Sequence, residues 1–555
     1  MTRLDFFLLL FPKDHIQKII GLTNAALRKQ GKDPISKGEL IKFFGIMILG
    51  TRFEFGSRRE LWATKNPSPF RVAPKFGSTT GMSRNRFDEI WYCIRWSYQP
   101  DVRPSNKSSA SFRWMLVDDF IEAFNKHRAE NYVPSHKICV DESMFRWYGI
   151  GGGWINKGLP MYVSMDRKPH AGCEVQDACD GISRIMMRLK LVKSEKVPST
   201  PSPNPIRFEY DSSSSTDDEP LTVDSVDSAL PHGTKVLLEL IKPWLDTGRI
   251  VVGDSYFASV PAVEEMTRRN MRFIGVVKTA TRRYPMRYLS LVELRGRGDY
   301  HGVVSEVMNK KIMAFVWADR NRRYFISNTS SIAPGAPCVR ERWRQVAAAE
   351  TQDDPERLTL EIDQPKCAEE YYGICARIDQ HNRARHDNLK FDTKYGTKDW
   401  SRRVNQSILA IIIVDTWFLY KGVLGEGCEE TQAEFYDLLS EEMIVNSLND
   451  PPSSLKRGQR QPEFGSPRSL VRVNGQLASG MGVRLTPTKK RRTKNGTLTP
   501  YLRQNDCRMC KKRTTHICSQ CRDESPNETE IYLCHAKSGR SCFKLHCDDH
   551  HYTEH

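Results

Sequence analysis

Two apolar segments of the chain each end on an aspartate. The first reads Lys137-Ile-Cys-Val-Asp141 and continues with Glu142, and the second reads Arg249-Ile-Val-Val-Gly-Asp254. An acid at the tip of a buried strand is held rigidly, and carboxylate oxygens are the ligands that Mg²⁺ prefers. Two such acids favour a two-metal site that acts on phosphodiesters. Strand-end aspartates also cap turns or pair with arginines, and the two segments alone do not separate these roles.

A third acid is the next requirement of such a site. Two divalent cations about 4 Å apart must be charge-balanced, which usually takes three carboxylates or more. Asp415 lies in an apolar stretch, where either a core-facing or a surface acid is ordinary. Asp379 ends the segment 373–379 and is followed by Gln, His and Asn, so we choose Asp379. The downstream candidates are Asp379, Asp387, Asp392, Asp399 and Asp415.

The elements around Asp254 predict an α/β sheet. Ser259 is a good helix cap, and Pro261 fits the first turn of a helix that begins there. Strand, helix and strand make residues 249–277 a parallel βαβ unit with Asp254 at the carboxyl end of its first strand. Further strands are predicted at 161–165, 183–192, 271–277, 311–318 and 322–328.

The C-terminal cysteines and histidines form a second site. Two Cys-x2-Cys pairs and the residues after them supply about eight ligands, enough for two tetrahedral Zn²⁺ ions. Cys547 and His550 compete for the last position, and the spacing does not fix the pairing. So short and polar a segment would hardly fold without metal. The predicted ligands are Cys507, Cys510, Cys518, Cys521, Cys534, Cys542, His546 and His550.

Charge indicates the class of partner. The net charge of +17 favours nucleic acid before membrane. The longest apolar runs, Phe6–Phe11 and Ile408–Val414, fall short of the roughly 20 residues of a membrane span, so no membrane partner is expected. Scattered cysteines outside the C-terminal cluster suit a reduced cytosolic or nuclear protein. A basic run is read as a nuclear localisation signal, a phosphate-binding tail, or both: Lys489, Lys490, Arg491, Arg492 and Lys494.

The composition divides the chain into successive regions. Residues 1–130 read as helical, with helix starts predicted at Ser36, in a capping box with Glu39, and at Ser83. A long core helix is expected at about 398–421. The regions are 1–130; 131–335 with a disordered acidic loop at 198–230; 336–370, an irregular insertion; 371–450, with the third aspartate; 451–500, a flexible basic linker; and 501–555, the zinc module.

Several segments together resemble the piggyBac family of DNA transposases. The resemblance runs through Val140–Phe145, Arg167–Pro169, Gly253–Ser259 and Tyr371–Asn382. It extends over most of the chain, and the order and spacing of the motifs are more specific than any one of them. The remaining matching residues are Thr23-Asn24, Glu39–Gly45, Arg58, Trp62, Met82–Phe87, Trp400, the helix Asn405–Tyr420 and the C-terminal cysteines.

The resemblance implies an RNase H-like catalytic core with inserted segments. A helical N-terminal DNA-binding and dimerisation region and a C-terminal cross-brace zinc module would flank this core. The catalytic aspartates of the family fall on Asp141, Asp254 and Asp379, which would bind two Mg²⁺ ions. The family often has a further acid three positions later, where this chain has Asn382. An amide oxygen can bind a metal but adds no negative charge.

The function that the resemblance implies is cut-and-paste transposition. A homodimer would act on double-stranded DNA, at the element ends and at TTAA targets, in the nucleus. The alternative is a domesticated derivative that binds DNA or chromatin without catalysis, against which the three retained aspartates argue. A second rival, a zinc-dependent interaction protein of the ubiquitin-ligase or histone-reader class, leaves the aspartate strands and the basic run unexplained.

Overall fold

The chain forms two compact units, residues 1–449 and 450–555. The computed structural model describes residues 1–66, 72–147, 163–164, 171–193, 230–307, 309–343, 357–397, 399–448 and, in the second unit, short segments only. The strands of the second unit are β12 (Leu470–Arg472), β13 (Lys490–Arg492), β14 (Leu498–Pro500), β15 (Asn505–Asp506), β16 (Arg513–Thr514) and β17 (His516–Cys518).

Every regular element described between residues 1 and 131 is helical. Ser36 and Ser83 cap their helices as predicted, because the Ser36 and Ser83 side chains accept from the amides of Glu39 and Arg86. The carboxylate of Glu39 binds the Arg86 guanidinium, with 2.7 Å between Oε1 and Nε. These helices are α1 (Arg3–Leu10), α2 (Lys13–Lys29), α3 (Lys37–Thr51), the 3-10 helix η1 (Arg58–Trp62), α4 (Phe76–Thr79), α5 (Arg84–Cys93) and α6 (Ser109–Asn131).

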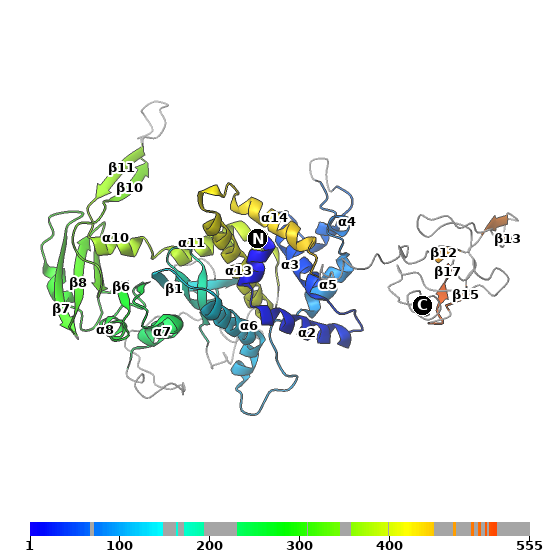
Figure 1. Cartoon of the computed structure of the whole chain (residues 1–555), viewed down its shortest axis with the longest axis horizontal. Coiled ribbons are helices and arrows are strands. Elements are labelled where there is room, and N and C mark those ends of the chain that lie inside the picture. Colours follow the sequence, from blue (N-terminus) through cyan, green and yellow to red (C-terminus); the bar gives the residue numbers. More distant parts are fainter. Residues whose placement is uncertain are drawn as a thin grey trace, which may run out of the picture. The chain divides into compact units, whose positions relative to one another are not determined.

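The first unit contains a large mixed sheet, with β7 and β8 at the left edge of the unit and β1 nearer its middle (Figure 1). Its strand order is β2-β3-β1-β5-β6-β9-β8-β7, with β4 beside β3. The β1–β5 and β5–β6 pairs are parallel, and the other pairs are antiparallel. The strands are β1 (Lys137–Trp147), β2 (Val163–Ser164), β3 (Ala171–Asp180), β4 (Met186–Leu191), β5 (Ile250–Gly253), β6 (Arg272–Val276), β7 (Tyr300–Val307), β8 (Lys310–Ala318) and β9 (Arg322–Ser327).

The predicted βαβ unit is confirmed. Strands β5 and β6 are parallel, and α8 (Val260–Arg268) connects them. Ser259 caps this helix by accepting from the amide of Ala262. The unit therefore leaves Asp254 immediately after β5, as the sequence indicates.

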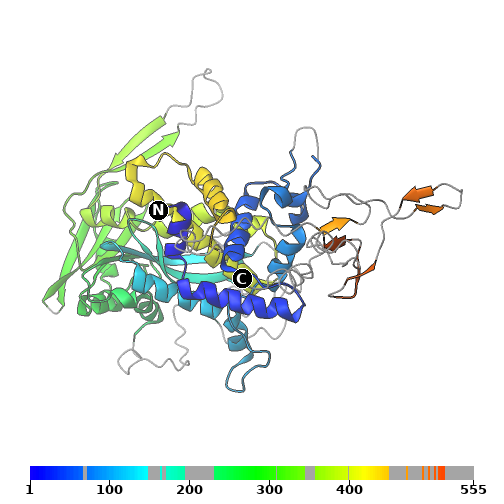
Figure 2. The same cartoon turned by 45° about the vertical axis from the view of Figure 1, so that its right-hand side comes forward.

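Helices cover both faces of the central strands (Figures 1 and 2). Val140 and Val251 share a hydrophobic cluster with side chains of α7 (His232–Ile241) and α8. Cys139 and Val252 belong instead to the cluster of α11 (Arg377–Arg383) and α13 (Trp400–Leu424). The other helices include α9 (Met286–Leu291), α10 (Lys366–Tyr372), the π-helical segment η4 (Ala384–Leu389), α12 (Phe391–Lys394), α14 (Gln432–Ile444) and two short 3-10 turns, Lys242–Trp244 and Gly425–Gly427.

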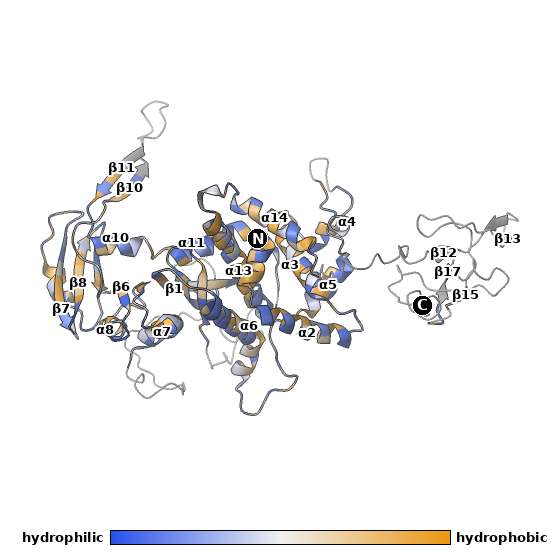
Figure 3. Cartoon of the chain, viewed as in Figure 1, coloured by the Kyte–Doolittle hydropathy of each residue, from blue (hydrophilic) through white to orange (hydrophobic). Residues whose placement is uncertain are grey.

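Helix α13 is the long helix expected at about 398–421. By length and composition it could cross a membrane, and Figure 3 shows its apolar character. Two thirds of its most apolar window, however, is buried inside the protein, as in the core helix of a soluble domain. Its hydropathy therefore reflects packing against α1, α6 and β1.

The sequence did not predict strands β3 and β7, and the prediction that 336–370 is irregular was wrong. Strands β10 (Cys338–Trp343) and β11 (Arg357–Ile362) pair in that segment as an antiparallel ribbon. Strand β3 was missed because Glu174, Gln176 and Asp177 are buried, which hides the usual alternation of polar and apolar residues. Gly172 is required in β3 because a Cβ there would lie 2.1 Å from the Phe145 carbonyl oxygen.

Candidate active site

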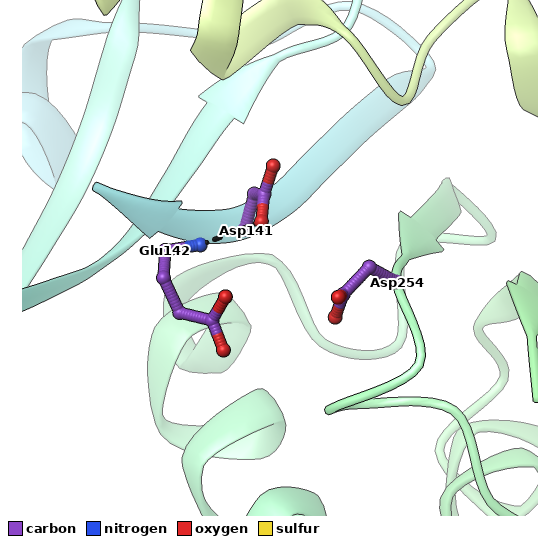
Figure 4. Close-up of side chains that lie close together, drawn as sticks. All are labelled: Asp141, Glu142 and Asp254. Carbon is purple, nitrogen blue, oxygen red and sulfur yellow. Dashed lines mark hydrogen bonds between the residues drawn. The ribbon is translucent and has the colours of Figure 1, made fainter. Parts of the chain in front are cut away.

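The strand register brings two of the predicted aspartates together. Val140 and Gly253 are partners across the parallel β1–β5 pair, and Asp141 and Asp254 follow them directly. Asp141, Glu142 and Asp254 each offer one carboxylate oxygen, and these three oxygens all lie within 4.8 Å of one another (Figure 4). Oxygens that share one divalent cation lie about 2.0–2.6 Å from it, and so within about 5 Å of each other. The group therefore fits a divalent metal.

Backbone amides orient both carboxylates, although only Asp254 ends a strand: β1 continues past Asp141 to Trp147, contrary to the prediction. The amide of Glu142 donates to Asp141 Oδ1 at 2.8 Å, and the amide of Tyr256 donates to Asp254 Oδ1 at 2.8 Å. Gln176 Nε2 in turn donates to the Tyr256 hydroxyl at 3.0 Å, which fixes the turn after β5 to β3. These contacts hold the planes of the two carboxylates, a condition for a metal site of defined geometry.

The three acids do not approach from one side of the sheet. Side chains alternate along a strand, so Asp141 lies on the face of Cys139, and Asp254 lies on the face of Val252, toward α11 and α13. Glu142 extends to the other side of β1 (Figure 4). Sequence reasoning did not select Glu142, and the only signal was its position next to Asp141. On a regular strand that position predicts the opposite face.

The structure places Asp379 near the site but not in the group of three. Asp379 is exposed in the first turn of α11, which packs against β1. Cys139 Sγ, on β1, donates to the Cys375 carbonyl at 3.6 Å. Burial, with smaller contributions from the nearby Cys139, Asp141 and Asp379, raises the pKa of the Cys375 thiol to about 12. The thiol of Cys375 is therefore close enough to Asp141 of β1 and Asp379 of α11 for both acids to influence its pKa.

Burial also raises the pKa of the Tyr371 hydroxyl, and Cys375, Asp254 and Asp141 add to this shift. Tyr371 is thus a buried neighbour of the carboxylate group. Its raised pKa keeps the phenol neutral beside acids that would carry negative charge.

Three of the other downstream aspartates have structural partners. Asp415 binds Arg128 at 2.8 Å and His381 at 3.2 Å. Asp392 binds Arg403 and lies 3.1 Å from His386. Asp399 caps α13 by accepting from the Arg402 amide. Of the five candidates these contacts leave Asp379 and Asp387, and only Asp379 is on the helix that packs against β1.

Asn382, at the position where the family often has a further acid, already has a partner. Its Oδ1 accepts from Arg385 Nη2 at 3.0 Å. The amide is therefore part of a contact between α11 and η4.

Several basic residues of the N-terminal helices are engaged in ion pairs. Arg52 pairs with Asp437, Arg58 with Asp88, and Arg86 with Glu39. Arg58 also lies over the Trp91 ring, 4.2 Å from its centroid. It lines a cavity of about 990 Å³ whose other cationic residues are Arg59, Lys390 and Lys394.

Part of the predicted zinc module is described. Cys507 is buried and Cys510 half-buried in the turn between β15 and β16. The Lys511 amide donates to the Cys507 carbonyl at 2.8 Å, and the Cys507 amide donates to the Lys512 carbonyl at 2.8 Å. Lys511 has a positive φ of 57°. These two backbone hydrogen bonds close the turn that carries both cysteines of the first Cys-x2-Cys pair.

The side chains of the remaining predicted ligands and of the basic run are outside the part of the chain that the structure describes. Cys518 is in β17, and its side chain is not described. Residues 490–492 form β13, and their side chains are not described either. Residues 198–229 of the predicted acidic loop lie outside the described residues. The other positions outside the described residues are Cys521, Cys534, Cys542, His546, His550, Lys489 and Lys494.

Comparison with known proteins gives a family and a fold. The model of the family described as Transposase IS4 matches residues 2–417, which include Asp141, Asp254 and Asp379. No curated protein matches the chain. A cryo-EM structure of a piggyBac transposase synaptic complex with hairpin DNA matches with a TM-score of 0.57 and 16% identity. The match covers 81% of this chain and 82% of that chain, and it shows a similar mixed α/β fold.

Proposed function

Because the chain belongs to this transposase family, of the piggyBac type, we propose that it cleaves and joins DNA strands in a metal-dependent reaction. The observation that carries the proposal is the carboxylate group at the point where the parallel β1–β5 pairing ends, with Asp254 directly after β5 and Asp141 within β1. The carboxyl ends of parallel strands are where α/β folds place their chemistry. A net charge of +17 suits a polyanionic substrate.

Asp141 and Asp254 would hold divalent metal, with Asp379 as the third acid. Bound Mg²⁺ supplies polarisation of the phosphodiester and a lower pKa for the attacking water or 3′-hydroxyl. The aspartates then act as ligands and not as nucleophiles. The amides of Glu142 and Tyr256 keep the carboxylates oriented, so that little reorganisation is needed when metal binds.

The strand order supports an RNase H-like core. Strands β4, β3 and β1 are antiparallel neighbours, and β5 and β6 follow in parallel to β1. In this assignment the antiparallel strands β7, β8 and β9 and the β10–β11 ribbon are inserted between the second and third acids. The insertion explains the long sequence separation of Asp254 and Asp379.

The C-terminal unit would bind two Zn²⁺ ions and recognise DNA ends. The first ligand pair is supported by the turn that carries Cys507 and Cys510, which backbone hydrogen bonds from Cys507 to Lys511 and Lys512 close. The basic run at 489–494 would direct nuclear import. A homodimer suits a reaction on two DNA ends.

The rival is a domesticated, non-catalytic DNA-binding protein. A scaffold has no need for carboxylates that two backbone amides orient toward a common point. The deciding experiment is excision of a donor with matched terminal repeats by the wild-type protein and by Asp254→Asn. Excision by the wild type and not by the variant supports the proposal. Equal excision by both contradicts the metal-site assignment, and excision by neither favours the rival.

A further inference from the structure

Arg385 is a buried cation at the junction of the elements that carry the proposed acids. Its side chain is only 1% exposed. One nitrogen, Nη2, lies 3.1 Å from the Met144 carbonyl oxygen, 3.0 Å from Asn382 Oδ1 and 3.1 Å from His386 Nε2. The guanidinium also lies over the Phe145 ring, 5.2 Å from its centroid.

These contacts connect two short stretches of chain. Met144 is three residues after Asp141 on β1, and Asn382 is three residues after Asp379 on α11. Arg385 itself is in η4, the π-helical segment that continues α11. Single π-helical turns inside helices occur frequently at functional sites. One side chain thus joins the strand of the first acid to the helix of the third.

The cluster behind Arg385 holds it in place. His386 Nε2 must be unprotonated, because a guanidinium can only donate. Its Nδ1 lies 3.1 Å from Asp392 Oδ2, and Asp392 also pairs with Arg403 of α13 at 3.1 Å. Burial lowers the pKa of His386 to about 4, so the ring stays neutral. The Arg385 guanidinium therefore donates to a neutral histidine, His386. That histidine lies beside Asp392, which pairs with Arg403 of the core helix α13.

Burying such a charge is expensive and adds little net stability even when it is paired. Its retention here is better explained by geometry than by stability. We propose that Arg385 is a positioning residue, which sets the separation between β1 and α11 and so brings Asp379 to the metal held by Asp141 and Asp254. The inference rests on the proposed function.

The same contact explains why an amide suffices at position 382. The Asn382 oxygen is a hydrogen-bond acceptor for Arg385, and this task needs no negative charge. In this arrangement Asn382 acts through Arg385 and is not itself a metal ligand.

The test uses the full-length protein and Mn²⁺ as the probe. Arg385→Lys keeps the charge but replaces the planar guanidinium, which lies over the Phe145 ring, with a compact ammonium, and Arg385→Met removes the charge. Arg86→Met is the control, because Arg86 is likewise an arginine that joins two elements, here α3 and α5 through an ion pair to Glu39. For each protein, thermal unfolding is measured against Mn²⁺ concentration, and donor excision is measured over the same range.

We expect both Arg385 variants to need about 10–100-fold more Mn²⁺ for half-maximal stabilisation, as for other residues that orient metal ligands. Excision by Arg385→Lys should recover partly at high Mn²⁺. Arg86→Met should unfold at a lower temperature with an unchanged Mn²⁺ requirement. A folded Arg385 variant with the wild-type Mn²⁺ requirement would overturn the inference.

Asn382→Ala keeps the test decisive if the Arg385 variants do not fold, since it removes one acceptor at a half-buried position. It should raise the Mn²⁺ requirement in the same direction, and an unchanged requirement would overturn the inference. A wild-type protein that Mn²⁺ does not stabilise would contradict the proposed function itself. If the wild type binds Mn²⁺ and excises the donor, and the variants have the same Mn²⁺ requirement, only the role of Arg385 is contradicted.

Discussion

Asp415 and Arg128 form a fully buried ion pair, with 2.8 Å between Oδ2 and Nη2 and side chains 0% and 1% exposed. The other carboxylate oxygen of Asp415 lies 3.2 Å from His381 Nε2 and accepts from the Met186 amide at 2.9 Å. One acid therefore joins α6, α11, α13 and β4. This arrangement separates a structural aspartate from a catalytic candidate, although both follow apolar residues in the sequence.

Asp415→Asn should destabilise the protein, because it leaves the Arg128 charge buried without its counterion. Breaking a buried pair in this way costs about 3–5 kcal/mol. Asp379→Asn should leave the unfolding free energy nearly unchanged, because Asp379 is exposed, and should abolish excision. Chemical unfolding and the excision assay together distinguish the two acids. Strong destabilisation by Asp379→Asn would contradict the assignment.

Asp254→Asn should abolish excision and the stabilisation of the protein by Mn²⁺, because a metal ligand is lost from the carboxylate group. The fold should persist, since the Asn oxygen can still accept from the Tyr256 amide. Thermal unfolding with and without Mn²⁺ is the measurement. Asp101→Asn is the control, because Asp101 is exposed and its ion pair is with the exposed Lys29, and it should behave as the wild type.

Glu142→Gln should weaken excision less than Asp254→Asn does. Glu142 lies on the other side of β1 from Asp141 (Figure 4). We therefore expect its carboxylate to contribute less to metal binding than the carboxylates of Asp141 and Asp254. An excision rate as low as that of Asp254→Asn, with a normal unfolding temperature, would instead make Glu142 a required ligand in the place given to Asp379.

Stability should fall as the pH drops from 6.5 toward 4. Burial lowers the pKa of His15 to about 4, with Lys18 adding to the shift. As the pH falls, His15 of the unfolded chain, with a pKa near 6.5, takes up its proton before His15 of the folded protein does. The contribution of neutral His15 to stability is therefore complete above pH 6.5 and is lost between pH 6.5 and 4. The contribution is about 3 kcal/mol. His15→Phe, which keeps the stacking on Phe120, should show a smaller loss in chemical unfolding between these pH values.

Cys510→Ser should release zinc from the C-terminal unit and abolish binding to DNA ends. Metal affinity and folding are coupled in so small a module. Zinc content per chain and gel-shift binding to a terminal-repeat duplex are the measurements. Cys428→Ser, outside the cluster, should retain both zinc and binding. Full DNA binding by a zinc-depleted protein would show that the module has another task.

Local sequence rules predicted the parts of the fold that depend on neighbours along the chain. Ser36, Ser83 and Ser259 were recognisable as helix caps because a cap requires only its own side chain and an amide three residues away. The apolar runs that lead into Asp141 and Asp254 were visible for the same reason, since each run and its acid are contiguous, but the continuation of β1 to Trp147 was not.

Only the tertiary structure decided which polar residues meet. The sequence does not show that Val140 and Gly253 pair, that Asp415 faces Arg128, or that Asn382 accepts from Arg385. Each contact joins residues whose partner is selected by packing of whole elements. The polar strand β3 and the β10–β11 ribbon were missed or misread because long-range pairing, and not an apolar alternation, stabilises them. The sequence thus determined that Asp141 and Asp254 could hold metal, and the pairing of β1 with β5 decided that they lie close together and that Glu142 joins them.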